Sequence, residues 1–175
     1  MTPFGRISIE IGDITTYDVD MIVNAANAAL CGGGGVDGAI HDAAGEELLR
    51  ACLALGGCKT GDAKVTPGFD LPARWIAHAV GPVWYGGHRD EPSLLASCYR
   101  RSLELALEHG CKSIAFPAIS TGAYRFPRPK AARIAIDTVV TFLSNDDALD
   151  RVIFVCAEHD VRDEHKKALA QMSLA

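Results

Sequence analysis

Hydrophobic and polar residues are distributed along the chain in patterns that are typical of β-strands. Residues 6–11 alternate between apolar and polar side chains with a period of two, which predicts a strand with one buried face. Short apolar runs that end at glycine, proline or polar residues predict buried strands. These runs are residues 21–23, 63–68, 75–80, 113–119 and 151–156.

Between these strands, apolar residues recur at the three- and four-residue spacing of amphipathic helices. The spacing predicts helices over residues 39–55, 93–109, 129–144 and 163–172. Gly56 and Gly57 end the first helix, in which the Ala44–Gly45 step is a weak point, and Gly110 caps the second. Strands that alternate with helices predict an α/β protein with a mostly parallel sheet covered by helices on both faces.

A run of four glycines, Gly32–Gly35, separates the strand at residues 21–23 from the helix that begins near Ala39. Glycines have no side chain to bury, and ordering each of them costs backbone entropy, so packing does not explain the run. The run therefore predicts a loop that lies close to a ligand. Because a helix follows, backbone N–H groups at the helix N-terminus favour an anionic ligand.

Composition narrows the class of protein. The 175 residues are expected to form one domain, 1–175, and 49% hydrophobic with 22% charged residues excludes a disordered chain. No apolar run approaches the roughly 20 residues of a membrane span, and the first residues do not resemble a signal peptide. The six cysteines form no Cys-x-x-Cys pair, so we expect buried thiols and a cytoplasmic location.

The formal net charge of -5 argues against a protein that binds nucleic acid along a basic face. A small anionic ligand is compatible with this charge, because oriented backbone N–H groups can bind it without lysine or arginine. No second ligand accompanies His78 at a spacing that suits a metal, so we expect His78 to be a core histidine. The sequence predicts neither a metal nor a cofactor.

Four segments together resemble the macrodomain family, in particular its MacroD-type ADP-ribosylhydrolase branch, whose members include O-acetyl-ADP-ribose deacetylases. They are Asn24-Ala25-Ala26-Asn27 with the glycine run and Val36-Asp37-Gly38-Ala39-Ile40-His41, then residues 12–15, 76–82 and 116–127. The resemblance spans nearly the whole chain. It implies a three-layer α/β/α sandwich with a mixed, mostly parallel central sheet.

The resemblance also implies the site residues. Asn27 and Asp37 would be catalytic. Asn27 would form hydrogen bonds with the hydroxyls of the distal ribose, and Asp37 would orient that ribose or activate a water molecule. Asp13 would accept a hydrogen bond from the adenine amino group, and Tyr124 would lie against the distal ribose. The implied ligand-binding residues are Asp13, Ile14, Asn27, Gly32, Gly33, Gly34, Gly35, Val36, Asp37, Ser120, Thr121, Gly122, Ala123 and Tyr124.

The implied function is hydrolysis of ADP-ribosyl esters on Asp or Glu side chains, of O-acetyl-ADP-ribose, or of both, by metal-independent attack of water. The implied partners are ADP-ribose and its conjugates, including ADP-ribosylated proteins, and nucleic acid only as an ADP-ribosylated end. The alternative is a non-catalytic reader that binds ADP-ribose. One departure concerns adenine, because Ala157 stands where this branch usually has an aromatic residue that stacks on the base.

Other interpretations follow from the residues alone. Asp13 and Asp37 are also typical helix caps, and Asn27 is also a typical turn residue. Without the resemblance, His41 is a hydrogen-bonded structural histidine. Residues 33–38 also satisfy the G-x-G-x-x-G pattern of nicotinamide-dependent oxidoreductases, but the glycines do not directly follow the strand, so this signal is weak.

Overall fold

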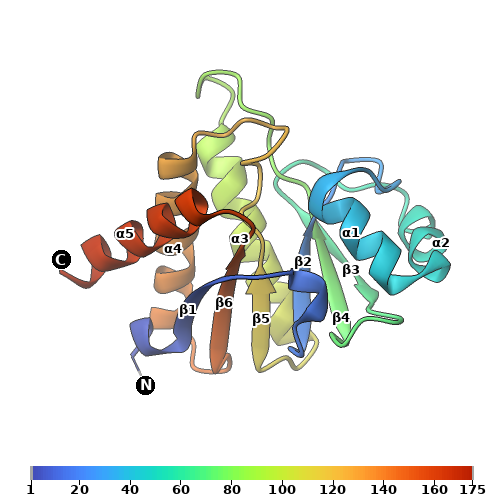
Figure 1. The fold of residues 1–175 in the computed structure, drawn as a ribbon, viewed down its shortest axis with the longest axis horizontal. Helices are drawn as coiled ribbons and strands as arrows, with labels where there is room; N and C mark the ends of the chain where they lie inside the picture. Colours follow the sequence, from blue (N-terminus) through green and yellow to red (C-terminus); the bar gives the residue numbers. More distant parts are fainter. Residues whose placement is uncertain (1, 175) are drawn as a thin grey trace.

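The computed structural model describes residues 2–174 (Figure 1). The strands are β1 (Ile7–Ile11), β2 (Met21–Ala25), β3 (Ala63–Pro67), β4 (Trp75–Ala79), β5 (Ser113–Phe116) and β6 (Arg151–Cys156). The helices are α1 (Gly35–Ala44), α2 (Glu46–Ala54), α3 (Glu91–Glu108), α4 (Arg128–Ser144) and α5 (His159–Ser173), with short 3-10 helices η1 (Phe4–Arg6) and η2 (Ile14–Thr16). No helix among these residues is both long and apolar enough to cross a membrane.

The strands form one six-stranded sheet in the order β1-β6-β5-β2-β4-β3. Neighbouring strands are parallel except β3, which pairs antiparallel with β4 at one edge. Helices α1 and α2 cover one face of the sheet, and α3, α4 and α5 lie on the other (Figure 1). The predicted three-layer sandwich with a mixed, mostly parallel sheet is therefore confirmed.

Alternation along the strands produces two hydrophobic cores, one on each face of the sheet. On β2, Met21 and Val23 face the core beneath α3 and α4, whereas Ile22 between them faces the core beneath α1 and α2. These side chains are fully buried. Both faces of the sheet are therefore packed, which leaves the ends of the strands as the place where a ligand can enter.

The helix predicted over residues 39–55 is wrong in two respects. It is divided into α1 and α2 at Gly45, whose φ of 94° is accessible mainly to glycine. A Cβ at this position would also lie 2.9 Å from Asp70 Oδ2. The helix begins at Gly35 rather than Ala39, because the N–H of Gly38 already donates to the carbonyl oxygen of Gly34 at 3.2 Å despite the low helix propensity of glycine.

Other predicted boundaries need smaller corrections. The strand predicted over residues 113–119 ends at Phe116, since Pro117 has no N–H group to donate to a neighbouring strand. Arg6 belongs to η1 rather than to β1. Helices α3 and α5 begin at Glu91 and His159, a few residues before the predicted starts at residues 93 and 163.

Candidate active site

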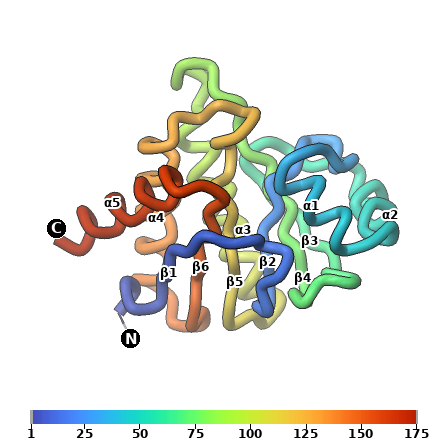
Figure 2. Tube along the Cα trace, in the orientation of Figure 1, coloured from blue at the N-terminus to red at the C-terminus, as the bar shows by residue number. Residues whose placement is uncertain are grey.

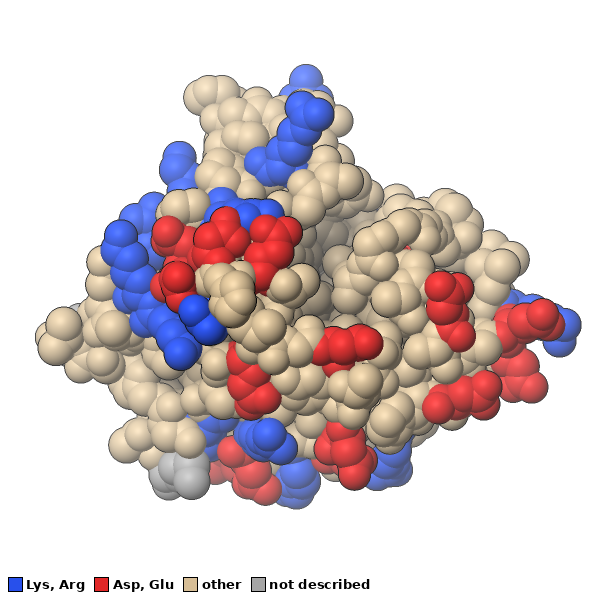
Figure 3. Space-filling view, viewed as in Figure 1, with Lys and Arg blue, Asp and Glu red and all other residues tan. Residues whose placement is uncertain are grey.

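A pocket of about 840 Å³ opens at the edge of the sheet where the parallel strands end. Its walls include the loop after β2 and the loop after β5, which are far apart in sequence but lie at the same edge of the sheet (Figure 2). The space-filling view shows the surface hollowed between these parts of the molecule (Figure 3). This is the position at which open α/β sheets bind ligands.

Nearly all of the predicted ligand-binding residues line this pocket. Gly32 is the exception: it lies outside the pocket, and its carbonyl oxygen accepts a hydrogen bond of 2.9 Å from Asn27 Nδ2. Gly32 therefore shapes the loop, with a φ of 82° that favours glycine. The predicted residues that line the pocket are Asp13, Ile14, Asn27, Gly33, Gly34, Gly35, Val36, Asp37, Ser120, Thr121, Gly122, Ala123 and Tyr124.

The glycine loop presents backbone N–H groups and open space to the pocket. Gly34 is the N-cap of α1 and Gly35 its first residue, so the N–H groups at this end have no partner within the helix. A Cβ on Gly34 would meet no atom within 4 Å, which means that the glycine leaves space unfilled. A Cβ on Gly38 would lie 2.7 Å from the carbonyl oxygen of Gly33, so Gly38 lets α1 pack closely against the loop.

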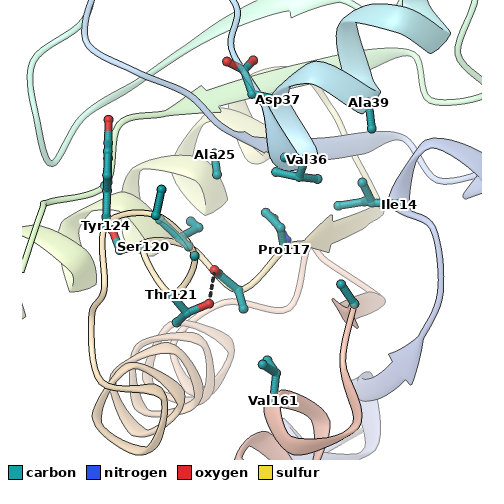
Figure 4. Close-up of a pocket in the computed structure, with 18 of the residues that line it drawn as sticks. Ile14, Ala25, Val36, Asp37, Ala39, Pro117, Ser120, Thr121, Tyr124 and Val161 are labelled. Atoms are coloured by element: carbon teal, nitrogen blue, oxygen red, sulfur yellow. Dashed lines mark hydrogen bonds between the residues drawn. The ribbon is translucent and has the colours of Figure 1, made fainter.

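The loop after β5 provides a second set of N–H groups. The N–H groups of Gly122, Ala123 and Tyr124 make no hydrogen bond within residues 2–174. The hydroxyl of Thr121 closes the turn by donating to the carbonyl oxygen of Ala118 at 2.8 Å (Figure 4). Ser120 Oγ is buried and has no hydrogen-bond partner in the same described part of the chain.

Ser120 is held in place by its neighbours. Its φ of 68° lies in the left-handed region, which is uncommon for a residue other than glycine. A Cβ built on Gly81, which follows β4 by two residues, would lie 2.2 Å from Ser120 Oγ. Gly81 is therefore required for the Ser120 side chain to occupy this position at the pocket wall.

Asp37 lies at one end of the pocket, with its side chain almost fully buried (Figure 4). Its Oδ1 accepts a hydrogen bond of 2.8 Å from Asn24 Nδ2 and lies 3.3 Å from His41 Nε2. The N-cap interpretation of Asp37 is wrong, because Gly34 occupies that position and Asp37 is the third residue of α1. Asp37 Oδ2 accepts no hydrogen bond within residues 2–174 and lies beside the glycine loop, 3.2 Å from where a Cβ on Gly33 would stand.

Asn24 on β2 is a supporting residue for which the sequence predicted no role. It is fully buried and places Nδ2 between Asp37 Oδ1 and His78 Nδ1, the second contact measuring 3.1 Å. His78 Nε2 lies 2.9 Å from Thr66 Oγ1. Because Asn24 Nδ2 is a donor, His78 Nδ1 accepts, and the ring proton sits on Nε2 and is donated to Thr66.

Burial, with a smaller contribution from the nearby His41, lowers the pKa of His78 to about 4. His78 is therefore neutral at pH 7, as its acceptor role toward Asn24 requires. The prediction that His78 is a core histidine is confirmed by its full burial and by these hydrogen bonds. Its function is to hold the Asn24 amide, which in turn holds Asp37.

This buried neutral histidine should make the protein less stable in acid. The unfolded chain takes up a proton at His78 below pH 6.5, whereas the native state resists protonation down to about pH 4. The free energy of unfolding should therefore fall between pH 6.5 and 4, by up to about 3 kcal/mol from this group. Urea unfolding at pH 7 and pH 4.5 measures the loss.

His78→Gln is the matched control for that measurement, because a glutamine does not titrate. Burial also lowers the pKa of His165, so a residual pH dependence is expected in the variant. If the unfolding free energy of the variant changes with pH as steeply as that of the parent, the acid sensitivity arises elsewhere.

Asn27 and Asp13 each form local hydrogen bonds while lining the pocket. The Asn27 amide spans its own loop, donating to Gly32 and accepting from the Cys31 N–H at 3.3 Å. Asp13 caps η2, accepting from the Thr15 N–H at 3.0 Å and from its hydroxyl at 2.7 Å. The turn and cap interpretations are thus confirmed, and the roles toward a ligand stay predictions.

The end of the pocket opposite Asp37 is more apolar. Ile14 and Val161 lie on its two sides (Figure 4), and Ala157, which follows β6, lines it without a side chain large enough to stack. The rim here carries Arg128, whose guanidinium pairs with Glu158 at 2.9 Å and with Asp160. Val161 and Arg128 carry no signal in the sequence beyond their places near the starts of helices.

Neither a metal cluster nor a cysteine nucleophile is indicated within residues 2–174. No group of three His, Cys, Asp or Glu side chains there could hold a metal ion. Cys52 Sγ lies 3.6 Å from His78 Nε2, but both residues are buried away from the pocket. Burial, with a smaller contribution from Asp37, raises the pKa of Cys52 to about 11, so its thiolate is not formed at neutral pH.

Known proteins are similar to this chain in sequence and in fold. The Macro domain family matches residues 23–135. A Macro domain-containing protein of Chlorobaculum tepidum is 58% identical over 90% of this chain and 92% of its own. A protein of Enterobacter cloacae named O-acetyl-ADP-ribose deacetylase is 50% identical over 95% and 94%. The Trypanosoma brucei macrodomain in complex with ADP-ribose superposes with a TM-score of 0.89 at 44% identity, covering 94% of this chain and 69% of the other.

These matches cover the glycine loop, the sheet and the pocket, and they confirm the resemblance found in the sequence. They place the G-x-G-x-x-G pattern in a macrodomain fold. The chain belongs to the Macro domain family.

Proposed function

We propose that this protein binds ADP-ribose in the pocket and hydrolyses ADP-ribosyl conjugates there. The candidate substrates are O-acetyl-ADP-ribose and ADP-ribosyl esters on Asp or Glu side chains of modified proteins. Relatives named O-acetyl-ADP-ribose deacetylase, about half identical to this chain, support a hydrolase. The macrodomain of Trypanosoma brucei in complex with ADP-ribose supports the choice of ligand.

The two sets of free N–H groups are suited to a diphosphate. They come from the glycine loop on one side and from residues 122–124 on the other, and both line the pocket. Hydrogen bonds to a charged acceptor contribute about 1.5–3 kcal/mol each, so few positive side chains are needed. The unpartnered Ser120 hydroxyl would donate to the same phosphates.

The remaining parts of the ligand then take opposite ends of the pocket. Adenine would lie at the apolar end between Ile14 and Val161, with its amino group near Asp13. The distal ribose would lie at the end that carries Asp37, Asn27 and Tyr124. Because Ala157 cannot stack, base stacking worth on the order of 1–3 kcal/mol is expected to be missing from that position.

The observation that carries the catalytic part is the Asp37 carboxylate. Its Oδ1 is fixed by Asn24 and its Oδ2 is free to orient the ribose or a water molecule. When water attacks the anomeric carbon of the distal ribose, its oxygen bonds to that carbon, the bond from the carbon to the ester oxygen breaks, and the acyl group leaves as a carboxylate while Asp37 accepts the water proton and passes it to solvent. When water attacks the ester carbonyl carbon instead, the bond from that carbon to the ribose oxygen breaks, and the proton that Asp37 accepted from water is returned to the ribose oxygen as it leaves. A non-catalytic reader would need no such fixed carboxylate, which favours the enzyme over the alternative.

Calorimetry and a product assay test this proposal. We expect ADP-ribose to bind with a Kd on the micromolar scale and nicotinamide dinucleotides to bind much more weakly, since their nicotinamide would meet the end that holds Asp37. Incubation with O-acetyl-ADP-ribose and with an ADP-ribosylated acceptor should release free ADP-ribose. Binding without release would identify a reader, and equal affinity for the dinucleotides would contradict the proposed placement of the ribose.

A further inference from the structure

Three exposed cations lie on segments next to Tyr124 of the pocket wall and are not used by the proposed reaction. They are Arg89 on the loop between β4 and α3, Arg125 on the loop after β5, and Lys130 in the first turn of α4. We call this set the basic rim. Figure 3 shows blue side chains on the protrusion above the hollow, while the red side chains in view lie lower.

Aromatic contacts fix the basic rim to the pocket wall. The N–H of Trp84 donates to the carbonyl oxygen of Tyr124 at 2.8 Å, which joins the β4–α3 loop to the loop that lines the pocket. Lys130 Nζ lies 5.5 Å from the centre of the Trp84 ring, and the Arg89 guanidinium lies 4.4 Å from the centre of the Tyr85 ring. Lys130 and Arg89 therefore lie against two aromatic rings of the β4–α3 loop, and Arg125 directly follows Tyr124 in the chain.

The β4–α3 loop is itself fixed by a buried carboxylate. The Glu91 side chain accepts hydrogen bonds from the N–H groups of Tyr85, Gly87 and Arg89, at 2.8, 3.0 and 2.6 Å. Burial raises the pKa of Glu91, but these backbone hydrogen bonds outweigh it and lower the value to about 2. The Glu91 charge is thus satisfied inside the loop, and Arg89 points its own charge to solvent.

The charges of the basic rim are not neutralised by this protein. None of its three cations forms an ion pair with a carboxylate within residues 2–174, although other arginines such as Arg101 and Arg128 do. Two carboxylates, the exposed Asp90 and the buried Glu91, directly follow Arg89, so the three cations leave a small local excess of positive charge. This excess stands against a formal net charge of -5 for the whole chain.

The position of the basic rim next to Tyr124 indicates which part of a substrate it would contact, namely the group attached to the distal ribose. Tyr124 and Asp37 lie at the same end of the pocket, and Val161 lies at the other (Figure 4). In the proposed binding mode, an acceptor attached to the distal ribose leaves the pocket past Tyr124 and meets the basic rim. Arg128, which also lines the pocket, has its charge already paired with Glu158 and Asp160.

We propose that the basic rim docks the peptide of an ADP-ribosylated protein when acidic residues flank the modified side chain. This inference rests on the proposed function. The modified Asp or Glu is an ester and carries no charge, so the flanking carboxylates supply the attraction. A peptide fits better than a nucleic acid, because three cations on a negative protein are few for a polyphosphate chain.

Matched peptides and matched charge reversals test the proposal. One peptide carries ADP-ribose on a glutamate flanked by Asp and Glu, and the other has Gln and Asn at the flanking positions. The double variant Arg89→Glu/Lys130→Glu is compared with Lys166→Glu/Lys167→Glu, which makes the same charge change at exposed positions of α5. For each peptide, kcat/KM and Kd are measured with the parent and with both variants.

We expect the rim variant to lose about tenfold in kcat/KM and in affinity on the acidic peptide, less so at high salt. The neutral peptide and O-acetyl-ADP-ribose should be processed as by the parent, and the α5 variant should match the parent throughout. Equal losses on both peptides, equal losses in both variants, or a loss only with an ADP-ribosylated oligonucleotide would each overturn the proposal.

Failure of the proposed function gives a different result. If the parent releases no ADP-ribose from any substrate, the docking role is still tested by comparing the Kd values of the two peptides for the parent and for both variants. A parent that binds both peptides equally, whether or not it cleaves them, would remove the docking role. A parent that binds no ADP-ribose would instead remove the proposed function itself.

Discussion

Asp37→Ala should slow hydrolysis by about 10²–10³-fold while at least part of the affinity for ADP-ribose is retained. If Asp37 orients the ribose or activates water, its contribution is concentrated in the transition state, and this loss of rate corresponds to about 3–4 kcal/mol. The variant should also melt earlier, since removing the carboxylate leaves Asn24 Nδ2 buried with one acceptor fewer, at a cost of about 1–3 kcal/mol. Single-turnover rates, binding constants and melting temperatures separate these effects.

Asp37→Asn is the matched control for stability. Its side-chain oxygen can still accept the hydrogen bond from Asn24 Nδ2, so it should melt closer to the parent but remain slow, because the charge is gone. Asn27→Ala should differ from both by weakening ground-state binding as well, because its amide shapes the glycine loop and lines the pocket. An Asp37→Ala protein that melts earlier but hydrolyses at the parent rate would remove the catalytic assignment.

Gly34→Glu should weaken ADP-ribose binding by 100-fold or more, about 2.7 kcal/mol, with little change in the fold. The φ of -97° at Gly34 suits any residue, and a Cβ there meets no atom within 4 Å, so the backbone need not move. The added carboxylate would lie in the space left for the ligand, beside the N–H groups proposed for the diphosphate. Calorimetry and circular dichroism measure the two effects.

Gly34→Ala and Gly34→Gln separate size from charge at this position. Alanine should retain most of the affinity because a methyl group fits the open space, and glutamine should lose less than glutamate because it does not repel phosphate. Unfolding of the glutamate variant would show that the glycine is required by the fold. Equal losses with glutamine and glutamate would show that volume alone excludes the ligand.

The strands and the layers could be predicted because they depend on local alternation. Strand β2 is apolar on both faces, with Met21 and Val23 on one face and Ile22 on the other. This is expected for a strand buried between two layers of helices. The break at Gly45 was visible only as a weak point, and there Asp70, a residue on another loop, donates its N–H to the carbonyl oxygen of Ala44 at 3.2 Å. Local sequence does not encode such a contact.

The site residues that lie within one sequence motif could be predicted. Those contributed by elements far apart in the sequence were harder to predict. The glycine loop and Asp37 lie within one short segment, and the resemblance identified them. The environment of Asp37 depends on β2 and β4, which bring Asn24 and His78 beneath α1 only after the sheet has formed. Val161 and Arg128 line the pocket because α5 and α4 pack side by side, which no motif signals.

The contact between Gly81 and Ser120 limits how this pocket can be redesigned. A Cβ at position 81 would collide with Ser120 Oγ and with Ile119, so a library that varies position 81 alone should yield mostly damaged pockets. Gly122 is different, because its Cβ would meet nothing within 4 Å and its φ is not positive. Engineering of ligand preference should therefore begin at Gly122 and Gly34, and treat positions 81, 119 and 120 as one unit that changes together.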